Sequence, residues 1–163
     1  MYRLALDLQP GEPSERHRLW VKLGDALANG GRVIEAAQAY LMAAESAHAS
    51  DRRELERQAA EQLLMGGHLD QGLELLRSVL SAAGLPLPAT SRRALLWIIL
   101  RRPYMLWRGT RFRERAESEI PAYDLWRVDL CHSAVRTLGF TETMLGIEFQ
   151  MRHLLLALKV GEP

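Results

Sequence analysis

Cysteine is almost absent from this sequence of 163 residues, where Cys131 is the single example. One cysteine cannot form a disulfide within the chain, which excludes a disulfide framework and favours a reducing compartment. Long apolar runs are missing too, because the longest, Ala94 to Leu100, falls far short of the roughly 20 residues of a membrane-spanning helix. Met1 to Pro13 contain no continuous apolar stretch typical of a secretory signal. We therefore expect a cytoplasmic protein without a transmembrane segment.

Charge of one sign does not predominate either. The sequence has 21 Lys and Arg residues against 20 Asp and Glu, a formal net charge of +1. This balance argues against nucleic acid as the partner of the whole chain. With 48% hydrophobic and 25% charged residues, the composition is that of a folded globular protein and excludes global disorder.

Patterns that carry catalysis or bind metals are also missing. Cys131 and His132 are neighbours, but adjacent residues on a helix point about 100° apart and cannot act as a pair. No second cysteine or histidine completes a metal site at a suitable spacing. No phosphate-binding Gly-x-x-x-x-Gly-Lys is present. We expect no catalytic residues, no cofactor and no metal, so the chain by itself is not predicted to be an enzyme.

What the sequence does contain is a helix hairpin from Trp20 to Ala43. Apolar residues recur at helical spacing on two segments separated by Gly30-Gly31. The pattern predicts one helix from Glu15 to about Asn29, capped by Ser14, and a second from about Val33 to His48. Gly24 allows the two helices to approach, and a large ring at Tyr40 fills the space.

A weaker copy of this hairpin follows 36 residues later. The shift carries Gly30-Gly31 to Gly66-Gly67, Leu27 to Leu63 and Tyr40 to Leu76. Ser50 and Asp51 are the candidate caps for its first helix, and the prolines of segment 84–88 end its second. A period in the mid-thirties, with a glycine turn between two helices, is typical of tetratricopeptide-type repeats.

The second half of the chain predicts further helices without a legible repeat. Thr90 or Ser91 should cap a helix through Arg101, which Pro103 kinks or ends. A polar loop with one helical turn spans 109–119. A helix then begins with Pro121 and closes at Gly139, and Thr141 caps the last one, which runs to about Val160.

The predicted fold is therefore all-α, an α-α superhelix of stacked hairpins with about seven helices and no strand. Its expected organisation is a lead-in at 1–13, two hairpins at 14–88, and a degenerate helical repeat region at 89–163 with a basic segment at 89–115.

The first hairpin resembles the tetratricopeptide consensus, with Leu27 in place of the family's usual tyrosine. The residues that carry the resemblance are Trp20, Leu23, Gly24, Ala36, Tyr40 and Ala43. The resemblance implies a stack of helix pairs that binds a protein or peptide segment.

A second resemblance spans most of the chain. Segments 57–64, 67–72, 111–115 and 149–155 look like the helical repeat region that follows the kinase and predicted ATPase domains of large bacterial serine/threonine protein kinases. The resemblance implies that this chain is the repeat region alone, since it has no glycine-rich loop, His-Arg-Asp or Asp-Phe-Gly. We expect a signalling role, with catalysis in other domains. The ending Gly161-Glu162-Pro163 is expected to turn into a further helix pair, so the chain would be a fragment.

The first candidate site is the surface that the first helix of each pair presents in such a stack. Its predicted partner-binding residues are Arg18, Val21, Asp25, Glu54, Arg57 and Glu61. The alternative is a solvated face with weak ion pairs inside each helix. Val21 and Asp25 do not supply the lysine and asparagine with which the family holds carboxylate tails, which argues against that ligand.

The second candidate site is the basic segment, where eight arginines accompany one acid, Glu114, and several aromatic residues. Such a mixture can bind nucleic acid or an anionic membrane surface. The overall neutrality of the chain favours a second interpretation, in which the arginines pair with acids elsewhere and the apolar residues are core, namely Leu95, Leu96, Trp97, Ile99 and Leu100. A third is that this segment docks onto an acidic face of another domain or subunit. If the segment does bind an anion, the alternative basic patch is expected at Arg101, Arg102, Arg108 and Arg111.

Overall fold

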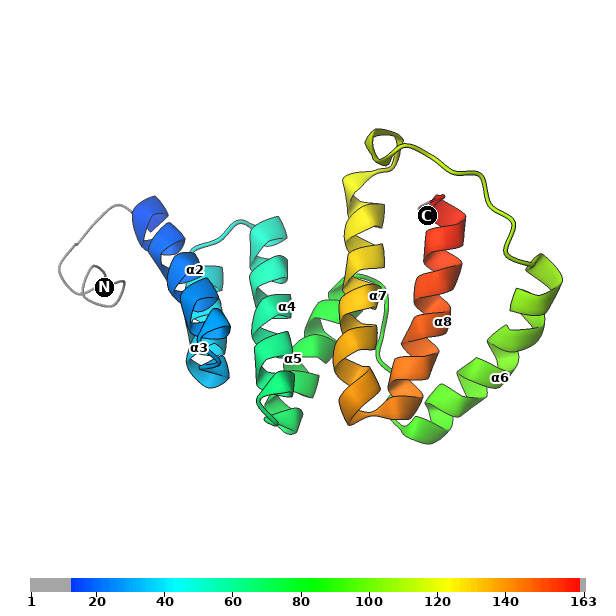
Figure 1. Ribbon diagram of the computed structural model, residues 1–163, viewed down its shortest axis with the longest axis horizontal. Coiled ribbons are helices and arrows are strands. Elements are labelled where there is room, and N and C mark those ends of the chain that lie inside the picture. Colours follow the sequence, from blue (N-terminus) through cyan, green and yellow to red (C-terminus); the bar gives the residue numbers. More distant parts are fainter. Residues whose placement is uncertain (1–12, 162–163) are drawn as a thin grey trace. The chain divides into compact units, whose positions relative to one another are not determined.

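The computed structural model describes residues 13–161, so residues 1–12 of the expected lead-in lie outside the described range. Between residues 13 and 161 the chain forms seven α-helices, one 3₁₀ turn and no strand, which confirms the all-α prediction (Figure 1). The elements are α2 (Pro13–Asn29), α3 (Val33–Glu45), α4 (Ala49–Met65), α5 (Leu69–Ala82), α6 (Ser91–Arg108), η1 (Glu117–Glu119), α7 (Ala122–Thr141) and α8 (Thr143–Val160).

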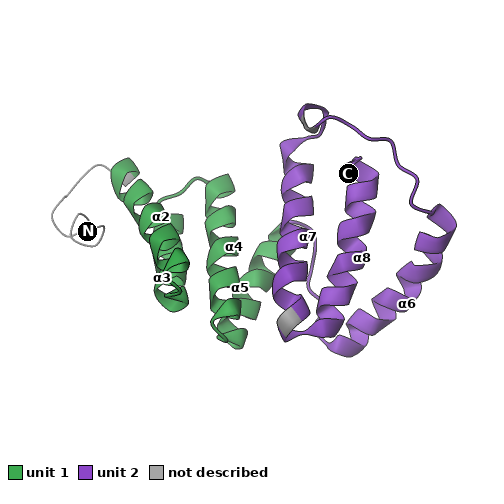
Figure 2. Ribbon diagram, in the orientation of Figure 1, with its two compact units in different colours: residues 1–82 green, residues 83–163 purple. Residues whose placement is uncertain are grey.

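The chain divides into two compact units, residues 1–82 and 83–163 (Figure 2). In the first unit each helix packs against the next, from α2 through α5. In the second unit α8 packs against both α7 and α6. Segment 83–88, which the sequence groups with the hairpins, is part of the second unit.

The two glycine turns have the same structure. Gly31 and Gly67 take positive φ of 71° and 80°, which glycine adopts without steric cost. The backbone N–H after each turn donates to the carbonyl five residues earlier, Arg32 to Leu27 and His68 to Leu63, both at 2.9 Å. A helix end with this hydrogen bond around a left-handed glycine is the Schellman motif. The 36-residue repeat of the sequence is therefore a repeat of local structure.

Small residues allow close packing within both hairpins, but at different places. In the first hairpin a Cβ on Gly24 would lie 2.6 Å from a ring carbon of Tyr40, so the ring occupies the space above the glycine. In the second, Gly72 of α5 faces Leu64 of α4, and a Cβ would approach the leucine to 2.6 Å. Each hairpin therefore pairs one large side chain with one glycine on the opposite helix.

The close approach of α7 and α8 depends on Gly146 of α8. A Cβ on Gly146 would lie 2.9 Å from the backbone of Gly139. Gly139 was expected to end its helix, but α7 continues to Thr141, because Gly139 does not take the positive φ of a helix stop. The cap of α8 is Glu142 rather than Thr141.

Helix α6 begins as predicted and ends later. Thr90 caps it, accepting a hydrogen bond from the backbone N–H of Arg93 at 3.3 Å. Pro103 does not end the helix, which runs on to Arg108. Because Pro103 is exposed, the carbonyl that its missing N–H leaves without a partner can face water. Among the described helices, α6 included, none has the length and apolar content needed to cross a bilayer.

Candidate functional site

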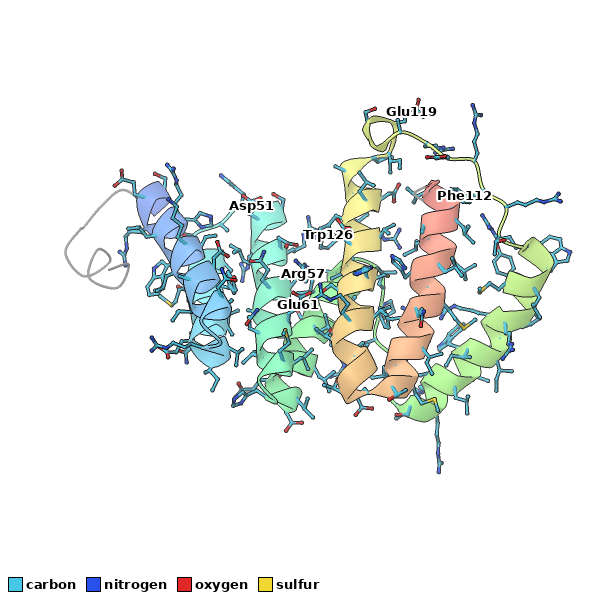
Figure 3. The ribbon with its side chains drawn as sticks, viewed as in Figure 1. Asp51, Arg57, Glu61, Phe112, Glu119 and Trp126 are labelled. Atoms are coloured by element: carbon cyan, nitrogen blue, oxygen red, sulfur yellow. The ribbon has the colours of Figure 1, made fainter. Side chains whose placement is uncertain are left out.

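The six predicted groove residues lie on two helices of the first unit. Arg18, Val21 and Asp25 follow one another along α2. The row on α4 consists of Glu54, Arg57 and Glu61. Figure 3 shows Arg57 and Glu61 pointing to one side of this helix. Arg18 and Asp25 are exposed, and the other four are half-buried.

Tyr40 of α3 interacts with predicted groove residues of both α2 and α4. Its hydroxyl donates a hydrogen bond to Oδ1 of Asp25 at 2.9 Å, although the tyrosine side chain as a whole is buried. Burial raises the pKa of Tyr40, and the hydrogen bond to Asp25 and the negative charges of Asp25 and Glu61 raise it further. The structure thus brings one acid from each hairpin near the same hydroxyl. The sequence suggested only that Tyr40 fills space.

Arg57 organises the row on α4. Its guanidinium forms ion pairs with Glu54 and Glu61, both at 2.5 Å and both within the helix. Pairs at this spacing stabilise a helix by about 0.2–0.5 kcal/mol each. They hold the three side chains in fixed positions, so that this surface is preformed.

In the second unit, the expectation that the apolar residues of the basic segment are core is wrong. Leu95, Leu96, Trp97, Ile99 and Leu100 are all exposed, and Ala94 is the one fully buried side chain of α6. The physical reason is that, among the described helices, α6 packs extensively only against α8, so most of its circumference is not covered by a helix. We call six exposed apolar residues at helical spacing the outward face of α6: Leu95, Leu96, Ile99, Leu100, Leu106 and Trp107.

The structure does not gather the four arginines of the predicted basic patch in one place. Arg101 bonds to Glu148 of α8, and Arg108 donates to the carbonyl of Leu158 near the end of α8 at 3.0 Å. A cation at that position also meets the negative end of the helix dipole. Arg102 and Arg111 are exposed. Within the described part of the chain, Arg101 is the one arginine of segment 89–115 that pairs with an acid.

A pocket of about 670 Å³ opens between α6, α8 and the segment 84–89 that precedes α6. Its walls are largely apolar and aromatic, including Leu87, Trp97, Tyr104 and Leu155. Five cationic side chains also line it: Arg93, Arg101, Arg108, Arg152 and Lys159. No acid is among its described lining residues.

Beside this pocket, two guanidinium groups share one buried carboxylate. Arg101 and Arg152 both bond to Oε1 of Glu148, with the Nε of Arg152 at 2.7 Å. Glu148 is fully buried, and its Oε2 has no hydrogen-bond partner among the described atoms. Burial lowers the pKa of Arg101, and the charge of Arg152 lowers it further. Because two guanidinium groups share one carboxylate, the cluster carries a net positive charge.

Arg152 also fixes the wall of the pocket. Its Nη1 donates to the carbonyl of Pro86 at 3.0 Å, and its guanidinium lies over the ring of Phe149, 4.8 Å from the centroid. Arg101 lies over Trp97 in the same way, at 4.9 Å. These contacts hold both guanidinium groups in place before any ligand arrives.

Cys131 and His132 lie on α7 and point in different directions, as the sequence predicts. Cys131 is fully buried, and burial raises the pKa of its thiol to about 11. His132 is exposed and contacts His153 of α8, with ring centroids 5.4 Å apart. No third metal-binding side chain joins these two histidines in the described part of the chain.

Glu148 and Arg152 were not among the site residues predicted from the sequence. A signal for them exists, because an acid and a base four residues apart lie among the apolar residues of helix 143–160. Charged side chains of a helix must be paired when they are buried. The partner across the fold, Arg101, is 47 residues away and has no local signal.

Comparison with known proteins adds no further identification, since no protein family, curated protein or solved structure matches this chain.

Proposed function

We propose that this chain is a non-catalytic protein-recognition module, a tetratricopeptide-type helical stack that acts in the cytoplasm as part of a larger bacterial signalling protein. The observation that carries the proposal is the outward face of α6. Its six apolar side chains are exposed to solvent, with Ile99 59% exposed and Leu106 78% exposed. Contiguous exposed apolar surface of this kind marks interaction sites.

The residue types on α6 also suit a protein interface. Trp107 is 85% exposed, and Arg92 and Arg102 border the apolar side chains. Tryptophan and arginine are enriched among the residues that dominate binding energy in protein interfaces. A rigid helix that presents them loses little conformational entropy on binding.

The test compares affinity capture by the wild-type chain and by the double variant Ile99→Glu/Leu106→Glu. Both positions are exposed, so the fold should persist, as circular dichroism would verify. A partner that binds this face should bind about thirtyfold more weakly and be recovered correspondingly less, since losing one central contact costs about 2 kcal/mol or more. Met65→Glu/Leu69→Glu, two exposed apolar residues of the first unit, is the matched control. Full recovery of every partner by the folded α6 variant would refute the proposal.

The α2 and α4 surface is the second contact region of this proposal. Asp25→Asn/Glu61→Gln removes two charges, and the amide oxygen that replaces the Asp25 carboxylate can still accept the Tyr40 hydrogen bond. A partner with a basic segment should bind this variant more weakly, as fluorescence anisotropy with peptides selected from a random library would measure. Asp51→Asn/Glu74→Gln changes the same charge at exposed sites and should bind normally.

A second candidate function is association with an anionic membrane surface through α6. The exposure of Arg102 on α6 and of Arg111 shortly after its end favours this function, because arginines near an apolar helix face suit the bilayer interface. Arg102→Gln/Arg111→Gln should then abolish co-sedimentation with phosphatidylglycerol vesicles, whereas Arg77→Gln/Arg136→Gln should not. The same loss with a DNA oligonucleotide, together with steep salt dependence, would assign nucleic acid instead.

A further inference from the structure

The pocket between α6 and α8 combines the volume of a small-molecule site with a cationic lining, and the proposed recognition role involves neither property. Its volume of about 670 Å³ lies within the range of small-molecule sites, about 300–1,000 Å³. Its walls are apolar, yet each of its described ionisable lining residues other than Tyr104 is a cation. Figure 1 shows α6 and α8 diverging along their length, and residues of both helices line the pocket.

The arginines beside the pocket are preorganised. Arg152 is held by Glu148 and by the carbonyl of Pro86, and Arg108 is held by the carbonyl of Leu158. Glu148 compensates only one of the two guanidinium charges that bond to it. A buried cluster with unbalanced positive charge favours the arrival of an anion, because the charges interact strongly where water is excluded.

Two further cations are free to bind a ligand directly. Arg93 and Lys159 are exposed, and neither side chain has an ion-pair or hydrogen-bond partner among the described residues. They come from different helices, α6 and α8, and both line the pocket. Arg93 lies near the start of α6 and Lys159 near the end of α8, and the two helices run in the same direction, so these cations stand at opposite ends of the pocket. An anion at Lys159, next to the Leu158 carbonyl that holds Arg108, would gain charge-assisted hydrogen bonds, which are stronger than neutral ones.

The walls favour an apolar body attached to that anion. Trp97 and Tyr104 lie on the pocket side of α6, about 10 Å apart along the helix axis at 1.5 Å per residue. Leu87 and Leu155 supply aliphatic surface from the other two elements. A free inorganic anion would leave this surface in contact with water, and a neutral apolar molecule would leave the cations unused.

We propose that this pocket binds a small amphipathic anion, a phosphate monoester or carboxylate that carries an acyl or aryl group. The anionic group lies at Lys159 beside the fixed guanidinium group of Arg108, and the apolar group lies against Trp97, Tyr104 and Leu155. The same chemistry occurs in a free metabolite and in a lipid headgroup with its chain.

Isothermal titration of the whole chain with dodecyl phosphate, below its micelle concentration, tests the site. Dodecanol and inorganic phosphate each present half of the ligand and should bind at least about tenfold more weakly, because each forfeits one class of contact. Equal affinity for dodecanol and dodecyl phosphate would overturn the proposal, since it would show partition onto exposed apolar surface.

The matched variants are Lys159→Gln and Arg136→Gln. Both positions are exposed, and each variant loses one positive charge, but only Lys159 lines the pocket. The first variant should weaken dodecyl phosphate binding about tenfold or more, and the second should leave it unchanged. Equal weakening by both would refute a specific site. Tyr104→Ala should weaken binding and leave the helical circular dichroism unchanged.

Vesicles of phosphatidylcholine with phosphatidic acid distinguish the two sources of ligand. If the Lys159→Gln variant loses vesicle binding as well, the pocket takes a lipid from the bilayer. If vesicle binding is absent or insensitive to this variant while dodecyl phosphate binding is lost, the pocket takes a free solute. Neither result depends on the protein-recognition role, which is tested on the outward face of α6.

Discussion

Cys131 illustrates how burial decides the chemistry of a single residue. Its side chain has no exposed surface in α7, and desolvation outweighs the nearby charges of Arg152 and Arg127, which act in the opposite direction. The thiolate is the reactive form of cysteine, and a pKa of about 11 leaves almost none of it at neutral pH.

We therefore expect the native protein to react with Ellman's reagent only as fast as it unfolds. In denaturant the thiol becomes exposed and should react at the rate of a free cysteine. Absorbance at the thionitrobenzoate band measures both rates. Rapid reaction of the native protein would contradict the buried position of Cys131.

His153 predicts how stability depends on pH. Burial lowers its pKa from the usual 6.5, and the nearby His132 lowers it further, more than Asp129 raises it. The unfolded chain therefore binds more protons at this residue than the native one. The stability from neutral His153 is complete above pH 6.5 and is lost as the pH falls through the native pKa.

Urea unfolding at pH 7.5 and pH 5.5 should therefore show a lower free energy of unfolding at the acidic pH. His153→Gln should reduce this difference, because glutamine does not titrate. His48→Gln, at an exposed histidine of the first unit, serves as control and should preserve the difference. An unchanged pH dependence in His153→Gln would show that other groups cause it.

At the scale of elements, the crossing of α7 and α8 rests on two glycines with opposite tolerance for a side chain. A Cβ on Gly146 would meet the backbone of Gly139 at 2.9 Å, and backbone cannot rotate away. A Cβ on Gly139 would meet nothing within 4 Å. The same chemical change should therefore have opposite effects at these two positions.

Gly146→Ala should destabilise the protein by about 1–3 kcal/mol, the usual cost of overpacking. Gly139→Ala should be neutral or stabilise it by up to about 1 kcal/mol, because alanine is the better helix former. Thermal and urea unfolding of both variants measure the difference. Equal destabilisation by both substitutions would mean that the helices do not cross at these residues.

At the scale of the whole molecule, each unit has its own buried cluster. Tyr40, Ala43 and Leu63 belong to one in the first unit, and Ile120, Val128 and Val160 to one in the second. Substitutions that damage one cluster should loosen the helices that share it, since local opening follows cooperative units.

Hydrogen exchange with mass spectrometry should show this division. In Gly24→Ala, where the new Cβ would lie 2.6 Å from Tyr40, exchange should increase through α2, α3 and α4 and remain unchanged in α7 and α8. Gly146→Ala should give the reverse pattern. A uniform increase across both units in either variant would contradict the division.

Much of the fold follows from local signals in the sequence. Gly31 and Gly67 mark their turns because only glycine takes positive φ without strain, and the apolar spacing around them places four helices to within a few residues. Thr90 and Gly161 mark the ends of helices for equally local reasons of capping. These signals act through hydrogen bonds between residues only a few positions apart.

What the sequence by itself determined is therefore the all-α class, the repeated hairpin turn and the composition of the basic segment. Only the tertiary structure decided that α6 leaves Leu96 and Ile99 exposed, and that Arg101 reaches the buried carboxylate of Glu148, 47 residues away. An apolar stripe shows that a helix face can pack against another element, but it does not show which neighbour covers that face. That choice depends on packing between distant segments, which local spacing does not encode.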